Sequence, residues 1–289
     1  MITALLDIVI AGLIMGGIFA LIAVGLNLQY GVARVLNLAH GEFIMLGAFG
    51  AYLLYVLFGI SPLISLVICA PFMFLIAFGI HRLLFQHLRM SSKSIAAFEG
   101  SSLLVAFGLS FVLQNAAALA FGSTTKAYSY LTQSVTLAGA MFAANRLVAL
   151  LFSVAFCLII YLFLAHTRIG KAIRATAQAL DTAQLVGVNV YMVLGISFGL
   201  GAVLAGLAGA LISMTLSISA YMGLQYIIIA LIVIVLGGLG NIIGSLIGGF
   251  ILGIVGSAVM YFNPGLTMAS YYILFLIILL VRPTGILGR

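Results

Sequence analysis

Long, uninterrupted apolar segments recur along the whole chain. Ile8–Leu28 is 21 residues long and carries no charge, and Leu147–Ala165 is a second such segment of 19 residues. A run of about 18 or more apolar residues is long enough to cross roughly 30 Å of hydrocarbon as a helix. A water-soluble domain of 289 residues does not have enough interior to bury that many segments. The pattern therefore predicts an all-α polytopic membrane protein.

Nine segments are apolar enough to be candidate membrane spans. They are Ile8–Leu28, Phe43–Phe58, Leu63–Ile80, Leu103–Phe121, Leu147–Ala165, Val190–Met214, Ile227–Leu236, Ile242–Phe262 and Met268–Val281. Counted as full crossings, they place the N-terminus outside and the C-terminus inside. The segments at 43–58, 227–236 and 268–281 are short, and short apolar segments interrupted by Gly or Pro suggest half-helices. We expect about 8–10 transmembrane helices, some discontinuous or re-entrant, in one membrane domain covering residues 1–289.

The charged residues, only 5% of the chain, indicate orientation more than chemistry. The net charge of +7 comes from basic residues scattered over short loops, which does not predict a nucleic-acid surface. Three basic clusters are Arg82, Arg89 and Lys93; Arg168, Lys171 and Arg174; and Arg282 and Arg289. The positive-inside rule places all three on the cytoplasmic side. Lys126 and Arg146 then fall on the opposite side.

A polar segment, Gln29–Gly47, separates the first two apolar segments. Its candidate functional residues are Arg34, Asn37, His40 and Glu42. A metal site needs about three or four ligands, and the chain has no second cluster of His, Cys, Asp or Glu, so we predict no bound metal. One interpretation is that these groups satisfy one another and nearby backbone at a helix break. The other is that they form part of a translocation path or its gate, because ionisable residues near membrane depth are often functional.

Glycines mark a second break and several helix contacts. Gly237, Gly238 and Gly240 fall within four residues, which predicts a broken helix that is buried or lines a cavity. Elsewhere, glycines at spacings of four predict close helix packing within the chain. These are Gly12 with Gly16, Gly195 with Gly199, and the series Gly240, Gly244 and Gly248.

The longest polar stretch with helical character is Thr167–Asn189. Lys171, Arg174, Gln178 and Asp181 recur at spacings of three and four, which indicates one polar helix face. Alanines give this stretch high helix propensity and a slim profile, and Gly187 is the expected C-terminal stop. Two interpretations remain: a helix lying on the membrane surface, or a docking helix whose small residues fit a groove on a cytoplasmic partner.

Four separated blocks of sequence carry a resemblance to a known family. They are Gly12–Tyr52, with NLAHGEFIMLGA at Asn37–Ala48; Arg168–Val190, RIGKAIRATAQALDTAQLVGVNV; Leu236–Gly249, LGGLGNIIGSLIGG; and Arg282–Gly288, RPTGILG. In this order they resemble the branched-chain amino acid ABC transporter permeases of the LivH-like type. The blocks cover the chain from end to end, so the resemblance is more specific than any one motif.

The resemblance implies a multi-pass transport subunit of the cell membrane and not an enzyme. It implies four kinds of partner: a second, LivM-like permease, two cytoplasmic ATPases, an extracytoplasmic binding protein and a small amino-acid-like solute. The chain has no GxxxxGK[ST] phosphate loop, so ATP would be used by the partner subunits and no cofactor is expected here. The resemblance makes Gly170–Gly187 the ATPase-coupling segment. Its candidate residues are Gly170, Lys171, Arg174, Ala175, Ala179, Asp181 and Gly187, and the candidates for a gate or path are Arg34, Asn37, His40, Glu42, Gly237, Gly238 and Gly240.

One position departs from the family pattern. Many LivH-like members carry a lysine eight residues before the first glycine of the break, and Ile229 stands there in this chain. Urea or short amides are therefore alternative solutes to branched-chain or related amino acids. An alternative from another class is a self-contained secondary transporter or channel. Its spans would need ionisable residues, and only Glu42 is a candidate, which argues against proton coupling.

Overall fold

The computed structural model describes residues 2–137 and 140–287, and this part of the chain is almost entirely helical. Eight of its helical segments are long and apolar enough to cross a membrane. They contain α1 (Ile2–Ala33), α2 (His40–Phe58), α3 (Pro62–Ile80), α5 (Ile95–Phe121), α6 (Ala144–His166), α9 (Val190–Ser213), α11 (Ile242–Phe262) and α12 (Thr267–Val281). A ninth apolar helix, α10 (Met222–Gly237), is shorter.

Short elements complete the described chain. They are the π-helical turn His81–Phe85, α4 (Gln86–Ser91), β1 (Ser134–Leu137), β2 (Ala140–Ala143), α7 (Arg168–Gln178), α8 (Leu180–Leu185) and the 3₁₀ turn Pro264–Leu266. Each of the nine predicted spans falls within or largely within one helix, which confirms the all-α polytopic prediction. The β1–β2 hairpin is antiparallel and was not predicted from the apolar pattern.

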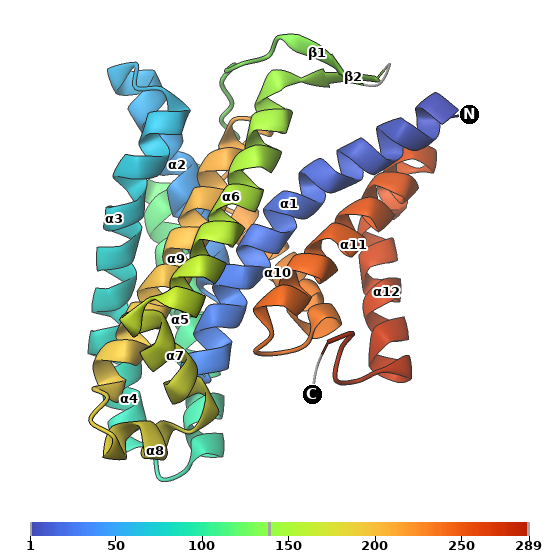
Figure 1. Cartoon of the computed structure of the whole chain (residues 1–289). Helices are drawn as coiled ribbons and strands as arrows, with labels where there is room; N and C mark the ends of the chain where they lie inside the picture. The colour runs from blue at the N-terminus through green and yellow to red at the C-terminus, as the bar shows by residue number, and fades with distance from the viewer. Residues whose placement is uncertain (1, 138–139, 288–289) are drawn as a thin grey trace.

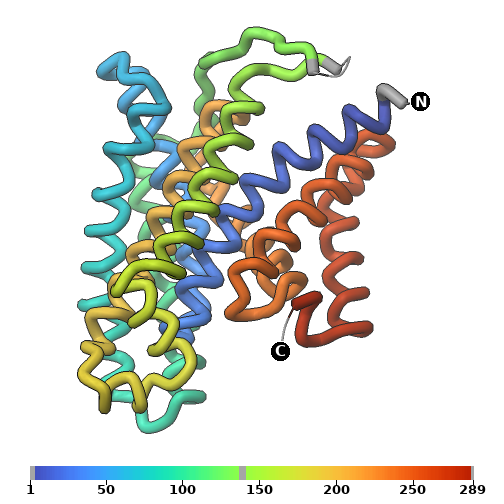
Figure 2. Tube along the Cα trace, viewed as in Figure 1, coloured from blue at the N-terminus to red at the C-terminus, as the bar shows by residue number. Residues whose placement is uncertain are grey.

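The helices form a bundle with two distinct ends (Figure 1). The β1–β2 hairpin and the start of α1 lie at one end, named here the hairpin end. Helices α4, α7 and α8 and the segment after α12 lie at the other, named the α7 end. The trace in Figure 2 shows α1, in blue, running beside α11, in orange-red, although they are more than 200 residues apart.

Glycine makes this contact between α1 and α11 possible. A Cβ atom added to Gly12 would lie 2.6 Å from Ile254 Cα, and one added to Gly16 would lie 2.8 Å from Phe250 Cα. Gly253 packs against the same stretch of α1 in return. Small residues at such spacing let two backbones approach in a membrane, where van der Waals packing drives helix association. The GxxxG prediction for this pair is therefore confirmed as packing within the chain.

Two helices begin inside the bundle. The linker 34–39 joins α1 to α2, and its Val35, Asn37 and Ala39 are fully buried. Gly41, in the first turn of α2, contacts the backbone of Gly223 in the first turn of α10. Since backbone without helical pairing is tolerated at this depth only when protein surrounds it, the burial of the linker explains how the chain can break there.

Candidate functional site

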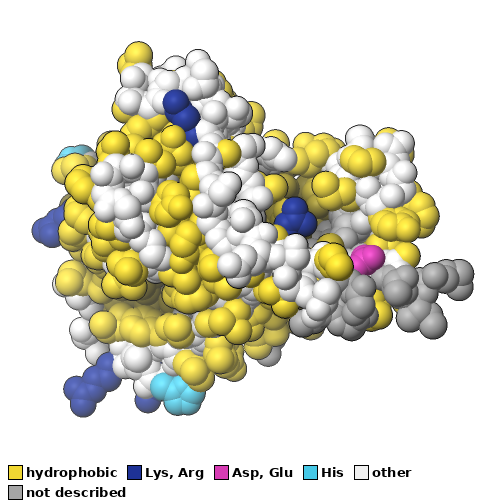
Figure 3. All heavy atoms as spheres, turned by 90° about the horizontal axis from the view of Figure 1, so that it is seen from above, with side chains coloured by type: hydrophobic (Ala, Val, Ile, Leu, Met, Phe, Trp, Pro, Cys, Tyr) yellow, Lys and Arg dark blue, Asp and Glu magenta, His cyan; other side chains and the backbone are white. Residues whose placement is uncertain are grey.

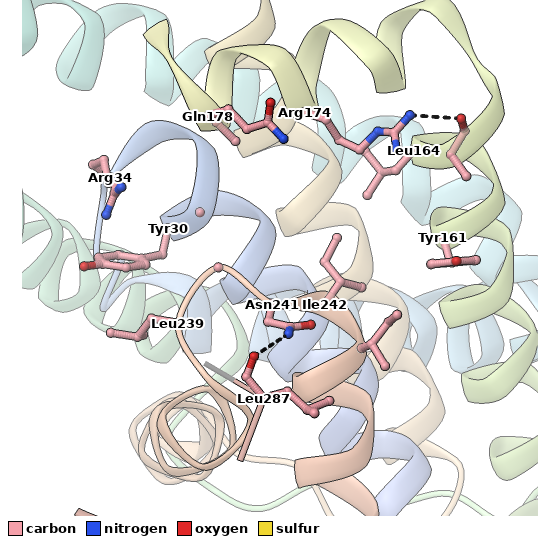
Figure 4. A pocket seen from close by; sticks show the side chains of 15 residues that line it. Tyr30, Arg34, Tyr161, Leu164, Arg174, Gln178, Leu239, Asn241, Ile242 and Leu287 are labelled. Carbon is pink, nitrogen blue, oxygen red and sulfur yellow. Dashed lines mark hydrogen bonds between the residues drawn. The ribbon is translucent and has the colours of Figure 1, made fainter. Parts of the chain in front are cut away.

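A cavity of about 600 Å³, the α7-end cavity, opens between α1, α6, α7 and the break that joins α10 to α11. Arg34, Arg174 and Gly240, which come from three separate predicted segments, all line it. Figure 4 shows Arg174 and Gln178 of α7 on one side and Asn241 and Leu287 on another. The structure therefore brings the predicted coupling segment, the predicted helix break and the end of α1 around one space.

Arg34 ends α1 and forms part of the cavity wall. Its backbone has a φ of 56°, a left-handed conformation uncommon for a residue other than glycine. Its N–H donates a hydrogen bond to the Tyr30 carbonyl at 2.9 Å. The guanidinium carbon lies 6.0 Å from the Tyr30 ring centroid, within the range of a cation–π contact. Arg34 is exposed, unlike the other predicted residues of the Gln29–Gly47 segment.

The break between α10 and α11 is held by Asn27 of α1. The Asn27 Nδ2 group donates hydrogen bonds to Ser245 Oγ at 2.7 Å and to the Asn241 carbonyl at 2.9 Å. Its Oδ1 accepts a hydrogen bond from the Gly240 N–H at 2.6 Å. Asn27 is 1% exposed, so one buried side chain satisfies backbone groups that the broken helix leaves without helical partners.

The glycines of the break serve two different needs. Gly238 and Gly240 have φ values of 103° and 82°, which side chains rarely permit. Gly237 has ordinary helical backbone but lies directly against the backbone of Gly244. The C-terminal segment also pairs with this region, because the Ile286 N–H donates to the Leu236 carbonyl at 2.8 Å and Asn241 Nδ2 donates to the Leu287 carbonyl at 2.8 Å.

A buried amide network lies behind the cavity. Asn37 Nδ2 donates to Gln29 Oε1 at 3.1 Å, and Gln29 Nε2 donates to the Phe198 carbonyl at 2.9 Å. His40 donates through Nε2 to the Ile22 carbonyl at 3.1 Å. Of the four predicted residues in this segment, Asn37 and His40 are thus bound to α1, the element before them. They fix the path of the linker from α1 into α2.

Glu42 lies where α2 and α10 begin. It is 3% exposed, and its Oε2 has no hydrogen-bond partner among the described residues. A Cβ atom added to Gly223 would lie 2.5 Å from Glu42 Oε1, so this glycine leaves room for the carboxylate. No group of three or more His, Cys, Asp or Glu in the described part of the chain is arranged to hold a metal ion.

The predicted coupling segment differs from one continuous helix. It forms α7 and α8, separated at Ala179, whose φ of −152° and ψ of 97° are extended. The reason lies in packing against the rest of the bundle. Ile173 in α7 and Ala183 in α8 are both buried, and the turn at Ala179 allows both side chains to be buried. The predicted stop is confirmed, since α8 ends at Leu185 and Gly187 has a φ of 86°.

The seven predicted coupling residues fall into two groups. Gly170 is buried and lies against the backbone of Phe163 and Leu164 at the end of α6, where a side chain has no room. Ala175 is half-buried and packs on the core. The remaining ones are exposed: Lys171, Arg174, Ala179, Asp181 and Gly187. The apolar tip beside Gly187 is also open, with Leu185 87% and Val186 74% exposed.

Sequence reasoning missed Asn27, Gln29 and Asn241. A signal for Asn27 was present, because an amide within the apolar run Ile8–Leu28 is expected to seek a partner inside the bundle. The pattern carried no information about that partner. Its partners in the chain are 211 to 218 residues away.

Fold and site together define a polytopic α-helical membrane protein with a polar-rimmed cavity at one end of its bundle. A family profile described as "branched-chain amino acid transport system / permease component" matches residues 8–281. This chain belongs to that family, which confirms the resemblance drawn from the four sequence blocks.

Individual relatives agree. The chain is 33% identical to the high-affinity branched-chain amino acid transport system permease protein LivH of Salmonella typhimurium, over 96% of this chain and 94% of that protein. It is equally similar to BraD of Pseudomonas aeruginosa, and 29% identical to a probable LivH of Methanocaldococcus jannaschii. PsaBC from Streptococcus pneumoniae, solved with a Fab, has a similar fold, with a TM-score of 0.50 at 14% identity over 98% of this chain and 97% of that one.

Proposed function

We propose that this chain is the membrane-spanning permease subunit of an ATP-driven importer for branched-chain or related amino acids. Membership of the permease family over residues 8–281 is the observation that carries this proposal. The arrangement supports it, since the exposed helices α7 and α8 lie beside a cavity that opens at the same end of the bundle. A transporter needs a cavity that gives access to its interior, and an energy-coupling partner needs an exposed surface on which to dock.

The α7 end is the cytoplasmic end in this proposal. Arg82, Arg89, Arg168, Lys171, Arg174 and Arg282 lie on elements that gather there (Figure 1). Of the Lys and Arg residues within 2–137 and 140–287, Lys126 and Arg146 lie towards the hairpin end. Since lysine and arginine favour cytoplasmic loops, this charge distribution supports a cytoplasmic C-terminus. The hairpin end then faces the extracytoplasmic binding protein.

Separate subunits complete the importer. Two cytoplasmic ATPases supply the energy, and one of them docks on α7 and α8 of this chain, so the chain itself needs no nucleotide or other cofactor. The exposed face with Lys171, Arg174, Ala179 and Asp181 is the proposed contact. Gly170 acts by holding the turn between α6 and α7. A second, LivM-like permease completes the pathway across the bilayer.

The gate in this proposal consists of two breaks: the linker 34–39 between α1 and α2, which lies beside the start of α10, and the glycine break between α10 and α11. Arg34 and Gly240 line the α7-end cavity, and Gly237 and Gly238 belong to the same break but are buried beside it. Asn37, His40 and Glu42 are also buried, in the single membrane domain. Glycine-rich, broken helices are positions where a bundle can rearrange with little steric penalty. Movement at these breaks would open and close the route between the two ends.

Reconstitution in liposomes tests the function. The chain alone should not accumulate L-leucine against a gradient, with or without a proton or sodium gradient. The chain with its co-purifying permease and ATPases, supplied with binding protein and ATP, should do so. Uphill uptake by the chain alone, driven by an ion gradient, would instead establish a secondary transporter. Uptake of urea or short amides but not of amino acids by the complete assembly would change the solute class.

A further inference from the structure

A second cavity lies at the opposite end of the bundle. This hairpin-end cavity has a volume of about 390 Å³ and is enclosed by α1, α10, α11 and α12, with the start of α6 at its rim. Small-molecule sites commonly measure roughly 300–1,000 Å³ and are mostly apolar with a few polar groups. The cavity meets both criteria, and none of the residues predicted from sequence as site residues lines it.

Its lining changes from polar to apolar with depth. Arg146 and Gln225 are exposed, whereas Ile14, Ile18 and Ile229 are 3%, 1% and 2% exposed. Arg146 is the only charged side chain among the described residues that line the cavity. The cavity therefore has one cationic group at its mouth and an apolar interior without charge. Figure 3 views this end of the bundle, where a few basic side chains lie among hydrophobic and neutral ones.

Neutral polar groups provide acceptors near the same space. Thr215, Gln225 and Ser257 all line the cavity, and their side-chain oxygens can accept hydrogen bonds. An α-amino acid presents a carboxylate, an ammonium group and a side chain on one carbon. A guanidinium is complementary to the carboxylate. Neutral acceptors are complementary to the ammonium group, and an apolar space is complementary to an aliphatic side chain.

We propose that the hairpin-end cavity binds an aliphatic α-amino acid, with its carboxylate at Arg146 and its side chain against Ile14, Ile18 and Ile229. This inference rests on the proposed importer function and adds to it a solute site within this chain. In this arrangement Arg146 recognises the carboxylate. The volume of the cavity, about 390 Å³, limits the size of the side chain.

Helix α10 connects this site to the α7-end cavity. Gln225, Tyr226 and Ile229 of α10 line the hairpin-end cavity, and Leu239 and Gly240, just beyond the end of α10, line the other. The amino acid site is therefore at the outer end of a route with two cavities, one lined by α10 itself and the other by the segment that directly follows α10. Between them, buried residues of α1 and α10 such as Ala23 and Val233 close the interior.

Protection of a cysteine from a thiol reagent tests the site. Ser257→Cys places a thiol in the cavity lining, in a chain whose buried Cys69 and Cys157 are replaced by alanine. L-Leucine, L-valine or L-alanine should slow its reaction with a maleimide in nanodiscs. Thr124→Cys, an exposed position at the same end but outside the cavity, should react at the same rate with and without these amino acids.

Arg146→Gln should raise the L-leucine concentration needed for half-protection about tenfold, the effect of losing one hydrogen bond to a charged group. L-Leucinamide, which has no carboxylate, should protect poorly and equally in both proteins. Arg146→Lys should restore part of the protection by L-leucine.

Two outcomes would overturn the proposal. These are equal protection at Thr124→Cys, and no protection of Ser257→Cys by any of the three amino acids, where slow labelling in nanodiscs would indicate a bound lipid. Uptake by the complete importer is measured separately. L-Leucine uptake without protection would preserve the importer function and reject this site.

Discussion

Asn27 illustrates how a single side chain stabilises a break inside a membrane bundle. The break between α10 and α11 leaves backbone groups without helical partners, and Asn27 binds the Gly240 N–H and the Asn241 carbonyl. Water is not available in a bilayer core to replace such bonds. The loss of this amide is therefore expected to affect the break more than the helix that carries it.

Asn27→Leu should lower the free energy of unfolding by on the order of 2–3 kcal/mol, because it removes the amide and leaves buried backbone groups unpaired. Thermal denaturation of the purified protein in detergent measures the change. Asn115→Leu is the matched control, since Asn115 is exposed on α5 and its amide bonds only to the Phe111 carbonyl in its own helix. Equal melting temperatures for the two variants would contradict the role assigned to Asn27.

Gly47 and Gly108 give a second contrast between single residues. Gly47 of α2 lies against the backbone of Gly206 in α9, and a Cβ atom at Gly108 of α5 would meet nothing within 4 Å. Gly47→Ala should cost about 1–3 kcal/mol by overpacking, because backbone cannot move aside as a side chain can. Gly108→Ala should stabilise by up to about 1 kcal/mol through helix propensity. Melting temperatures that shift in the same direction would reject this packing interpretation.

At this scale the sequence indicated which residue types matter but not their partners. Glycine spacing predicted close packing, and the contacts of Gly12 and Gly16 confirmed it. Arg34 was grouped with Asn37, His40 and Glu42 because they are near in sequence. The structure separates Arg34 from them because the linker turns inward directly after it. Neighbouring positions in an extended linker reach different depths, and polar spacing alone does not reveal depth.

The helices α7 and α8 behave as one element with two faces. Ile173 and Ala183 attach the inner face to the bundle, and the outer face carries Lys171 and Asp181. The periodicity that predicted one helix was correct for the spacing within α7. It could not reveal the turn at Ala179, because alanine is compatible with helical and extended backbone alike and the cause is burial on both sides of it.

Ala179→Trp should abolish co-purification of the ATPase while leaving folded yield unchanged, since Ala179 is exposed at the proposed contact. Ala96→Trp, an equally exposed alanine at the same end of the bundle but outside this segment, should leave co-purification intact. Ala175→Trp is less informative because Ala175 also packs on the core. Retention of the ATPase at wild-type level by Ala179→Trp would indicate that α7 and α8 only lie on the membrane surface.

The distribution of charge organises the whole molecule into two ends. Lys126 is held at the hairpin end by two backbone hydrogen bonds of 2.8 Å, one donated to Ile218 and one accepted from it. Burial raises the pKa of nearby Tyr128 to about 12, so that its hydroxyl stays protonated. Arg168 begins α7 at the other end. These two sites are far from the bundle centre and report on orientation directly.

Lys126→Cys should react with a membrane-impermeant maleimide in intact cells, whereas Arg168→Cys should react only after the membrane is permeabilised. The reason is the excess of basic residues at the α7 end, which favours the cytoplasm. Labelling is measured by a shift in electrophoretic mobility, in a chain without Cys69 and Cys157. If Arg168→Cys reacted in intact cells and Lys126→Cys did not, the proposed orientation would be inverted. If both reacted equally in intact cells, the two positions would not lie on opposite sides of the membrane, which would contradict the arrangement of the bundle.

At the level of the whole bundle, the sequence predicted most of the architecture. Hydropathy alone located every described membrane helix, because crossing a bilayer demands length and apolarity that can be counted. It could not predict that α1 packs on α11, or that one cavity is lined by α10 and a second by the segment that directly follows it. Those features depend on which faces meet, and lipid-facing and protein-facing residues are equally apolar here. The β1–β2 hairpin was missed because two strands of four residues each are too short to leave a hydropathy signal.

The contact between α1 and α11 has a consequence for biosynthesis. Helix α1 can complete its contact with α11 only when residue 262, the end of α11, has been made. Chains grow at about 5–20 residues per second, so Asn27 and the glycine face of α1 spend many seconds in the membrane without their final neighbours. A chain that stops before Gly238 lacks every partner of the Asn27 side chain in the break. Its α1 then carries an amide without a partner in the bilayer core, a costly state that only the longer chain relieves.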